Sequence, residues 1–211
     1  MEKKCQKNTN VHLLLSKYPH YLILSLLLYC IDAPYYSPVI SLLALLLFFR
    51  SPDRELPRGT TTSLCSPADG NVVSISSDEH YYRIAIFLTV MDVHVQYSPC
   101  DGTVVSQRYK KGEFHPAYLL EKSQYNERME TDIVTNSGDL ITVIQIAGQI
   151  ANRIESFVQK GTSVSHGCRL GIIKFGSRVD LIVPKASYVL SEKIVIGKHL
   201  TAGETLVFHK K

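Results

Sequence analysis

The step Gly176-Ser177 lies between two runs that read as β-strands, residues 169–174 and 178–184. Both runs are short and contain several β-branched residues. Glycine inside a strand commonly marks a bulge or a close approach of two backbone segments. Its carbonyl is also unshielded by a side chain, so the next hydroxyl can attack it. The step is therefore either an ordinary bulge or a place where the chain breaks its own backbone.

His94 and Asp69 are the residues that could assist such an attack. His94 lies in an alternating segment, with Asp92 two positions earlier on the same face. Asp69 precedes a glycine in Pro-Ala-Asp-Gly, where an aspartate usually shapes a turn. An Asp–His–Ser set is recognised by its geometry and not by its order in the chain. The sequence thus offers Asp69, His94 and Ser177 as a candidate set and leaves their structural roles open.

Short strands must position these residues. Segments 83–88, 141–146 and 179–183 are rich in β-branched residues and are bounded by turn signals such as Asp69-Gly70. Residues 117–128 have a weak helical pattern. We predict a mainly β domain with a barrel- or sandwich-like architecture.

Two internal repeats support a barrel. Residues 66–74 recur 32 residues later as 98–106, with seven of nine positions identical. A spacing of two glycines and a leucine also recurs, 36 residues apart, as Gly161, Gly167 and Leu170 and then Gly197, Gly203 and Leu206. This spacing resembles the corners of lipoyl- and biotinyl-type β-barrels. We therefore expect repeated units related by pseudo-symmetry.

The N-terminal part contains two apolar runs, residues 21–31 and 39–49, joined by a turn with two prolines. Each run has 11 residues, whereas a straight membrane span needs about 20. A helical hairpin in one leaflet, two tilted spans and a buried core hairpin are the alternatives. Basic residues flank both outer ends but not the turn, which predicts cytoplasmic ends. We expect residues 1–57 to associate with the cell (inner) membrane and residues 58–211 to form a β domain on its cytoplasmic side.

Composition excludes some other classes of function. The formal net charge is +4 and no basic stripe interleaved with aromatic residues is present, so we expect no nucleic-acid partner. The five cysteines are widely spaced and include no CxxC pair, so we expect no metal site.

Ordered blocks along the chain resemble the phosphatidylserine decarboxylase family, in particular its shorter bacterial and archaeal branch. Each block is weak alone, but together they follow one order from residue 48 to the C-terminus. They are residues 48–54 with Pro57, 66–70 with Val72, 92–94 with Pro99 and Gly102, 126–128, 145–148, and 175–177.

The resemblance implies a self-cleaving proenzyme. Ser177 Oγ would attack the carbonyl of Gly176, with His94 as general base and Asp69 orienting the imidazole. The products would be a large chain, 1–176, and a small chain, 177–211, that stay together. Ser177 would be converted into a pyruvoyl group.

In this family the pyruvoyl group is the cofactor, and neither PLP nor a metal is needed. It would form a Schiff base with the serine head group of phosphatidylserine and release CO2 to give phosphatidylethanolamine. His94 is the best candidate to reprotonate the product, because Met91 stands where the longer branch has a second histidine. The substrate is a phospholipid, and the oligomeric state is left open, with a homodimer as one alternative.

Two further residues are candidate substrate contacts. Arg178 could bind a carboxylate or phosphate, or it could be a solvent-facing strand residue. His115 is a spare acid or a surface residue. The alternative function is a membrane-tethered, lipoyl/biotinyl-like β-barrel binding module without catalysis. Such carriers need a lysine in a hairpin, typically beside methionine, and Lys174-Phe175-Gly176 lacks that context.

Overall fold

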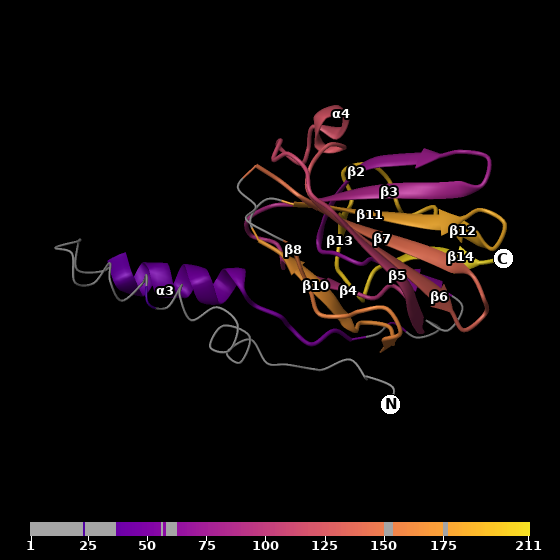
Figure 1. Ribbon diagram of the computed structural model, residues 1–211, viewed down its shortest axis with the longest axis horizontal. Coiled ribbons are helices and arrows are strands. Elements are labelled where there is room, and N and C mark those ends of the chain that lie inside the picture. Colours follow the sequence, from indigo (N-terminus) through magenta and orange to yellow (C-terminus); the bar gives the residue numbers. More distant parts are fainter. Residues whose placement is uncertain (1–22, 24–36, 56, 58–62, 150–153, 175–176) are drawn as a thin grey trace.

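The protein is mainly β, as predicted. The computed structural model describes residues 23, 37–55, 57, 63–149, 154–174 and 177–211. The largest sheet curls as a half-barrel (Figure 1) and is antiparallel throughout its named pairs. Its strand order is β13 (His199–Leu200), β2 (Gly70–Ser77), β3 (Tyr81–Leu88), β11 (Ser177–Pro184), β7 (Leu140–Ala147), β6 (Arg128–Thr135), β5 (Gly102–Lys110) and β9 (Ser163–Val164).

Two three-stranded sheets complete the domain. One has the order β1 (Ser63–Cys65), β14 (Leu206–Lys210) and β12 (Tyr188–Leu190). The other has the order β4 (Val95–Tyr97), β10 (Arg169–Ile173) and β8 (Ile154–Ser156). The predicted helical segment 117–128 contains only the short helix α4 (Leu120–Ser123).

Strand β11 lies at the centre of the large sheet, between β3 and β7. Its first residue, Ser177, pairs with Leu88 on one side and Ala147 on the other. Val179 and Leu181 are fully buried in the main hydrophobic core. Because side chains alternate along a strand, Ser177 shares their face and Arg178 lies on the opposite face.

The small sheet of β4, β10 and β8 brings His94 beside the chain that leads to Ser177. Val95 pairs with Ile172, and the N–H of Ile173 donates to the carbonyl of His94 at 3.2 Å. Ile173 is the last residue of β10, and β11 begins at Ser177. The antiparallel register therefore places His94 beside Ile173, which precedes Ser177 by four residues. Gly176 itself lies outside the described residues.

The first repeat identified in the sequence forms matching structures. The residue just before each copy donates to the other copy, from Cys65 N–H to Pro99 O (3.0 Å) and from Tyr97 N–H to Pro67 O (2.8 Å). Each copy also has a glycine after its aspartate, at positions 70 and 102. A Cβ at Gly70 or Gly102 would lie 2.3 Å from a carbonyl oxygen of the neighbouring strand. Only glycine allows this close approach, which explains the repeated Asp-Gly pair.

The second repeat supplies the partners of the first. The N–H groups of Gly203 and Gly167 donate to Ser66 O (2.8 Å) and Ser98 O (3.1 Å), respectively. β13 pairs with the start of β2 and β9 pairs with the start of β5. The predicted pseudo-symmetry thus has a hydrogen-bond basis, while the likeness to lipoyl- and biotinyl-type units stays a prediction.

The second apolar run forms helix α3 (Ser37–Phe48), which projects from the β domain (Figure 1). It exposes a set of large apolar side chains: Val39, Ile40, Leu42, Leu43, Leu46 and Leu47. α3 is therefore not a buried core helix of this domain. Among the described residues, no helix has the length and apolar content needed to cross a bilayer. The first run lies outside the described residues apart from Ile23, so the predicted hairpin stays a prediction.

The end of the N-terminal segment is part of the β domain. Phe48 and Phe49 are buried in a second hydrophobic cluster together with Val93, Val95 and Tyr97. The predicted domain boundary between residues 57 and 58 adjoins residues 58–62, which lie outside the described residues. The packing of Phe48 and Phe49 nevertheless connects α3 directly to the segment that carries His94.

Candidate active site

Ser177 is completely buried, and its hydroxyl has an unusual environment. Within the described residues, Ser177 Oγ makes no hydrogen bond. A buried hydroxyl without a partner costs free energy and is rare in native proteins. The main-chain pairing of β11 with β3 and β7 holds Ser177 in place despite this cost.

His94 is also completely buried, with one ring nitrogen bonded and the other without a partner. Nδ1 lies 2.9 Å from the backbone carbonyl of Asp92, and Nε2 has no hydrogen-bond partner in the described part of the chain. A carbonyl oxygen only accepts, so Nδ1 must carry the proton. In the neutral ring Nε2 is then an unprotonated acceptor.

The surroundings of His94 favour this neutral form. Burial lowers the pKa of His94 to about 4, assisted by the charge of Arg50 and opposed by Asp92 and Asp69. The ring of Phe48, at the end of α3, lies over the imidazole with centroids 4.2 Å apart. At neutral pH His94 is therefore uncharged and can accept a proton at Nε2.

Two buried glutamines connect the strand of His94 to the sheet of Ser177. Gln96 Nε2 donates to His94 O at 2.8 Å, and Gln145 Nε2 donates to Gln96 Oε1 at 2.7 Å. Gln145 pairs with Val179, two residues from Ser177. Neither glutamine was predicted to have a role, although a polar residue such as Gln96 within a short apolar strand is a signal for a buried hydrogen bond.

Asp69 lies near this region but does not bond to His94. Its Oδ1 accepts from Arg54 Nη2 at 2.7 Å and from the N–H of Ala202 at 2.8 Å. The described structure has no hydrogen bond between Asp69 and the imidazole. Asp69 acts on His94 through its charge, which favours the protonated ring. The group that contacts Nδ1 is the backbone carbonyl of Asp92.

The side chain of Asp92 fixes the loop that supplies this carbonyl. Its Oδ2 accepts from both Thr89 N–H and Thr89 Oγ1 at 2.7 Å, and its Oδ1 lies 3.0 Å from His199 Nε2. Burial raises the pKa of Asp92, but the hydrogen bonds from His199 and Thr89 outweigh it and the pKa is lowered. The sequence placed Asp92 beside His94 but gave no signal for His199.

The two candidate substrate contacts, Arg178 and His115, make their bonds to other parts of the protein. Arg178 is 2% exposed, so the alternative that it faces solvent is wrong. Its guanidinium contacts protein groups on the face of β11 opposite Ser177, including Ser123 Oγ at 2.6 Å. His115 lies before α4, with Nε2 hydrogen-bonded to Glu113 and the side chain partly exposed. Met91 is an exposed loop residue and carries no acid.

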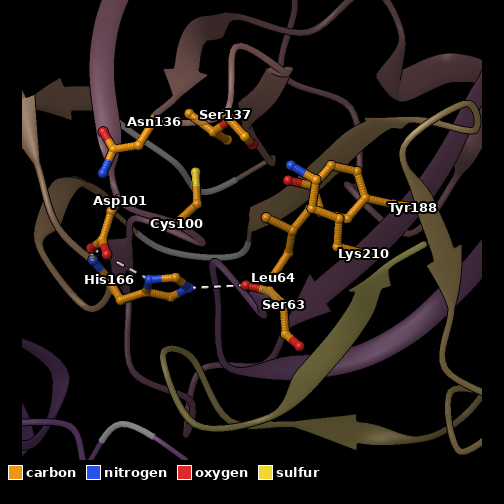
Figure 2. Close-up of a pocket in the computed structure, with 10 residues that line it drawn as sticks. Ser63, Leu64, Cys100, Asp101, Asn136, Ser137, His166, Tyr188 and Lys210 are labelled. Carbon is orange, nitrogen blue, oxygen red and sulfur yellow. Dashed lines mark hydrogen bonds and ion pairs between the residues drawn. The ribbon is translucent and has the colours of Figure 1, made fainter. Parts of the chain in front are cut away.

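A cavity of about 380 Å³ lies near the second copy of the repeat (Figure 2). His166 is at its edge, with Nε2 directed to Ser63 O at 3.1 Å and Nδ1 3.4 Å from Asp101 Oδ1. The cavity contains none of the predicted site residues. The described residues also include no cluster of three or more side chains able to hold a metal.

Known proteins match most of the chain. The family model for phosphatidylserine decarboxylase matches residues 42–208. A phosphatidylserine decarboxylase proenzyme from Burkholderia pseudomallei is 39% identical over 166 residues, covering 76% of this chain and 75% of that protein. One from Aromatoleum aromaticum has the same identity and coverage. One from Granulibacter bethesdensis is 40% identical over 172 residues, covering 77% of this chain and 69% of that protein.

Proposed function

The chain belongs to the phosphatidylserine decarboxylase family, and we propose that it is a self-cleaving proenzyme of a phosphatidylserine decarboxylase. The observation that carries the proposal is a pair of buried polar atoms. Ser177 Oγ and His94 Nε2 both lack a hydrogen-bond partner within the described residues. The strand register places His94 beside Ile173, four residues before Ser177 in the chain. A nucleophile and a base that are buried but unpaired are typical of a reactive site.

Cleavage begins with Ser177 Oγ. It attacks the carbonyl of Gly176, the C–N bond breaks and an ester forms, while His94 Nε2 takes the hydroxyl proton and returns it to the leaving nitrogen. Elimination across residue 177 then releases the carboxylate of Gly176. The remaining enamine tautomerises and reacts with one water, which gives the pyruvoyl group and ammonia. The products are chains 1–176 and 177–211.

The position of residue 177 suits a pyruvoyl group. It is buried at the start of a central strand, and its side-chain oxygen makes no hydrogen bond to any described residue that conversion would break. When formed, this group supplies an electrophilic carbonyl that reacts with an amine and withdraws electrons as CO2 leaves. No PLP is required.

His94 also has the properties needed later in the reaction. After decarboxylation a carbon atom must receive a proton. Because burial keeps His94 neutral at rest, a proton that it binds is readily released. We assign the protonation to His94 and not to Met91, which has no proton to give. His115 is the second candidate for the proton donor. It ranks below His94 because it is partly exposed and its Nε2 is hydrogen-bonded to Glu113.

The substrate head group is a serine ester of a phospholipid, so the enzyme must reach a membrane. Support comes from α3, whose exposed apolar side chains precede the Phe48 ring that lies on His94. The proposal includes residues 1–57 as the membrane-associating segment and a location at the inner membrane, with the β domain on the cytoplasmic side. The non-catalytic lipoyl/biotinyl-like module is not favoured, because the relatives are named as proenzymes of an enzyme.

The test is the covalent state of the purified protein. The 23.7 kDa chain should yield fragments of about 4 and about 20 kDa, in proportion to their residue numbers. The small fragment should resist Edman degradation, because a pyruvoyl group has no amine. Ser177→Ala should remain a single chain and be inactive, whereas the matched strand variant Ser74→Ala should be cleaved normally. An intact wild-type chain that decarboxylates phosphatidylserine would rule the mechanism out.

A further inference from the structure

Arg178 is a buried charge that the chemistry above does not use. It follows the reactive residue directly, is 2% exposed, and lies on the opposite face of β11 from Ser177. Burying a guanidinium is costly unless its donors are paired. The contacts of Arg178 therefore indicate what the residue does.

Arg178 joins the first residues of β11 to the segment that contains α4, residues 115–126, called the α4 segment below. Nη1 donates to Ser123 Oγ at 2.6 Å and to Ala117 O at 3.5 Å. On its own strand, Nη2 donates to Asp180 Oδ2 at 3.3 Å, whereas Nε lies 2.9 Å from Asp180 Oδ1 as an ion pair without hydrogen-bond geometry. Asp180 is fully buried and balances the charge of Arg178 within β11, while the bonds to Ser123 and Ala117 connect the strand to the segment.

The α4 segment is itself fixed at the same level of the sheet. Asn126 Nδ2 donates to Ala147 O at 2.7 Å and to His115 O at 2.7 Å. Ala147 is the residue that pairs with Ser177 across β7 and β11. Arg178 and Asn126 therefore attach one rigid segment to two adjacent strands, next to the reactive residue.

Self-cleavage changes what holds residue 177. Before cleavage the chain is continuous on both sides of it. Afterwards residue 177 is the first residue of the small chain, and chain ends open locally at low free-energy cost. Residue 178 then provides the first side-chain anchor of that chain.

We propose that Arg178 is a positioning residue that prevents the new end of the small chain from fraying, so that the group formed from Ser177 keeps its buried position. This inference rests on the proposed function. It also reassigns Arg178, which the sequence presented as a contact for a substrate carboxylate or phosphate. A positioning role requires the buried contacts to Ser123, Ala117 and Asp180, whereas a substrate role would require donors that a ligand can reach, and Arg178 is 2% exposed.

Arg178→Met tests the proposal by separating cleavage from turnover. Cleavage should proceed within about threefold of wild type, because the intact chain still holds Ser177 from both sides. In the cleaved enzyme, kcat for phosphatidylserine should fall about 10- to 100-fold at unchanged KM, since small displacements of reacting groups are costly. Amide hydrogen exchange in residues 178–182 of the cleaved enzyme should become about tenfold faster or more. Arg178→Lys, which keeps the charge but not the fork, should be intermediate.

Arg83→Met is the matched control. Arg83 also pairs with Asp180, from β3, but its side chain is 47% exposed and it has no bond to the α4 segment. Arg83→Met should leave kcat for phosphatidylserine and amide hydrogen exchange in residues 178–182 unchanged. Ser123→Ala removes only the partner that lies 2.6 Å from Arg178 Nη1. It should lower kcat and speed amide exchange as Arg178→Met does, but by less. If Arg178→Met does not fold, Ser123→Ala provides the test of the proposal.

Three results would overturn the proposal. Equal losses of kcat in Arg83→Met and Arg178→Met would mean that Arg178 only balances the charge of Asp180. A raised KM with normal kcat and normal exchange would make Arg178 a substrate contact. Wild-type kcat in both Arg178→Lys and Ser123→Ala would remove the anchor altogether. Failure of the wild-type chain to cleave is a different outcome, which refutes the proposed function itself.

Discussion

The two copies of the repeat have matching backbones but different chemical environments. In each copy the aspartate accepts a backbone N–H at 2.8 Å, from Ala202 to Asp69 and from His166 to Asp101. Asp69 also pairs with Arg54, and the two side chains are only 10% and 8% exposed. The side chain of Asp101 is 44% exposed and faces His166 at the cavity of Figure 2.

This comparison separates structure from chemistry. Accepting the turn N–H is common to both aspartates, so it is a property of the repeat and not of the active site. Only Asp69 is buried with a cation and acts on His94 through its charge. The histidines differ in the same way, because both nitrogens of His166 face protein oxygens while His94 Nε2 has no partner in the described structure. The second copy is therefore an internal control for the first.

The largest expected difference is between the two histidines. His94→Ala should slow self-cleavage about 100- to 10,000-fold, the usual contribution of a general base. His166→Ala should be cleaved at the wild-type rate, because its ring bonds only to the domain's own atoms near the cavity. The measurement is the fraction of cleaved chain against time on a denaturing gel. Comparable cleavage rates in His94→Ala and His166→Ala would mean that the different surroundings of the two histidines have no bearing on cleavage.

The aspartates should differ next, in stability. Asp69→Asn leaves the buried Arg54 with only the more distant Glu204, at 3.9 Å, as a charge partner, and breaking a buried pair costs up to about 3–5 kcal/mol. Asp101→Asn should cost less than about 1 kcal/mol, because the Asp101 side chain is 44% exposed and its only acidic–basic contact is with His166 at 3.4 Å among the described residues. Both amides can still accept the turn N–H, so urea unfolding of the two variants isolates the charge. To keep one covalent species, both are made in the uncleaved Ser177→Ala background.

If the two variants unfold at the same urea concentration, the Arg54–Asp69 pair has no special weight. Cleavage of the single variants adds a second readout. Asp69 raises the pKa of His94 but does not bond to it. Asp69→Asn should therefore slow cleavage far less than His94→Ala does, by about tenfold or less on the scale of a long-range charge. A loss as large as that of His94→Ala would restore a direct role for Asp69.

The sequence predicted the mainly β class of fold, which the structure confirms, because this depends on local patterns; the reactive residues that it offered stay a prediction. Strand alternation and Asp-Gly turns are read within a few residues, and the ordered blocks include Ser177 and His94. The supporting contacts join residues far apart in the chain, such as His199 with Asp92, 107 positions apart, and Gln145 with Gln96, 49 positions apart. Such pairs depend on strand register, which periodicity alone does not give. Burial of Arg178 was missed for the same reason, since α4 covers it from another segment.

A further expected difference is the pH dependence of stability contributed by His94. Its pKa falls from 6.5 to about 4 on burial, so between these values the unfolded chain binds more protons than the folded one. Stability should therefore decrease as pH falls from about 6.5 to about 4, by on the order of 3 kcal/mol in total, and be unaffected above this range. Urea unfolding of Ser177→Ala should show this decrease, and the same chain with His94→Gln should lack that part of it. Parallel curves for the two proteins would mean that folding does not change the pKa of His94, so that burial does not hold the ring in its neutral form.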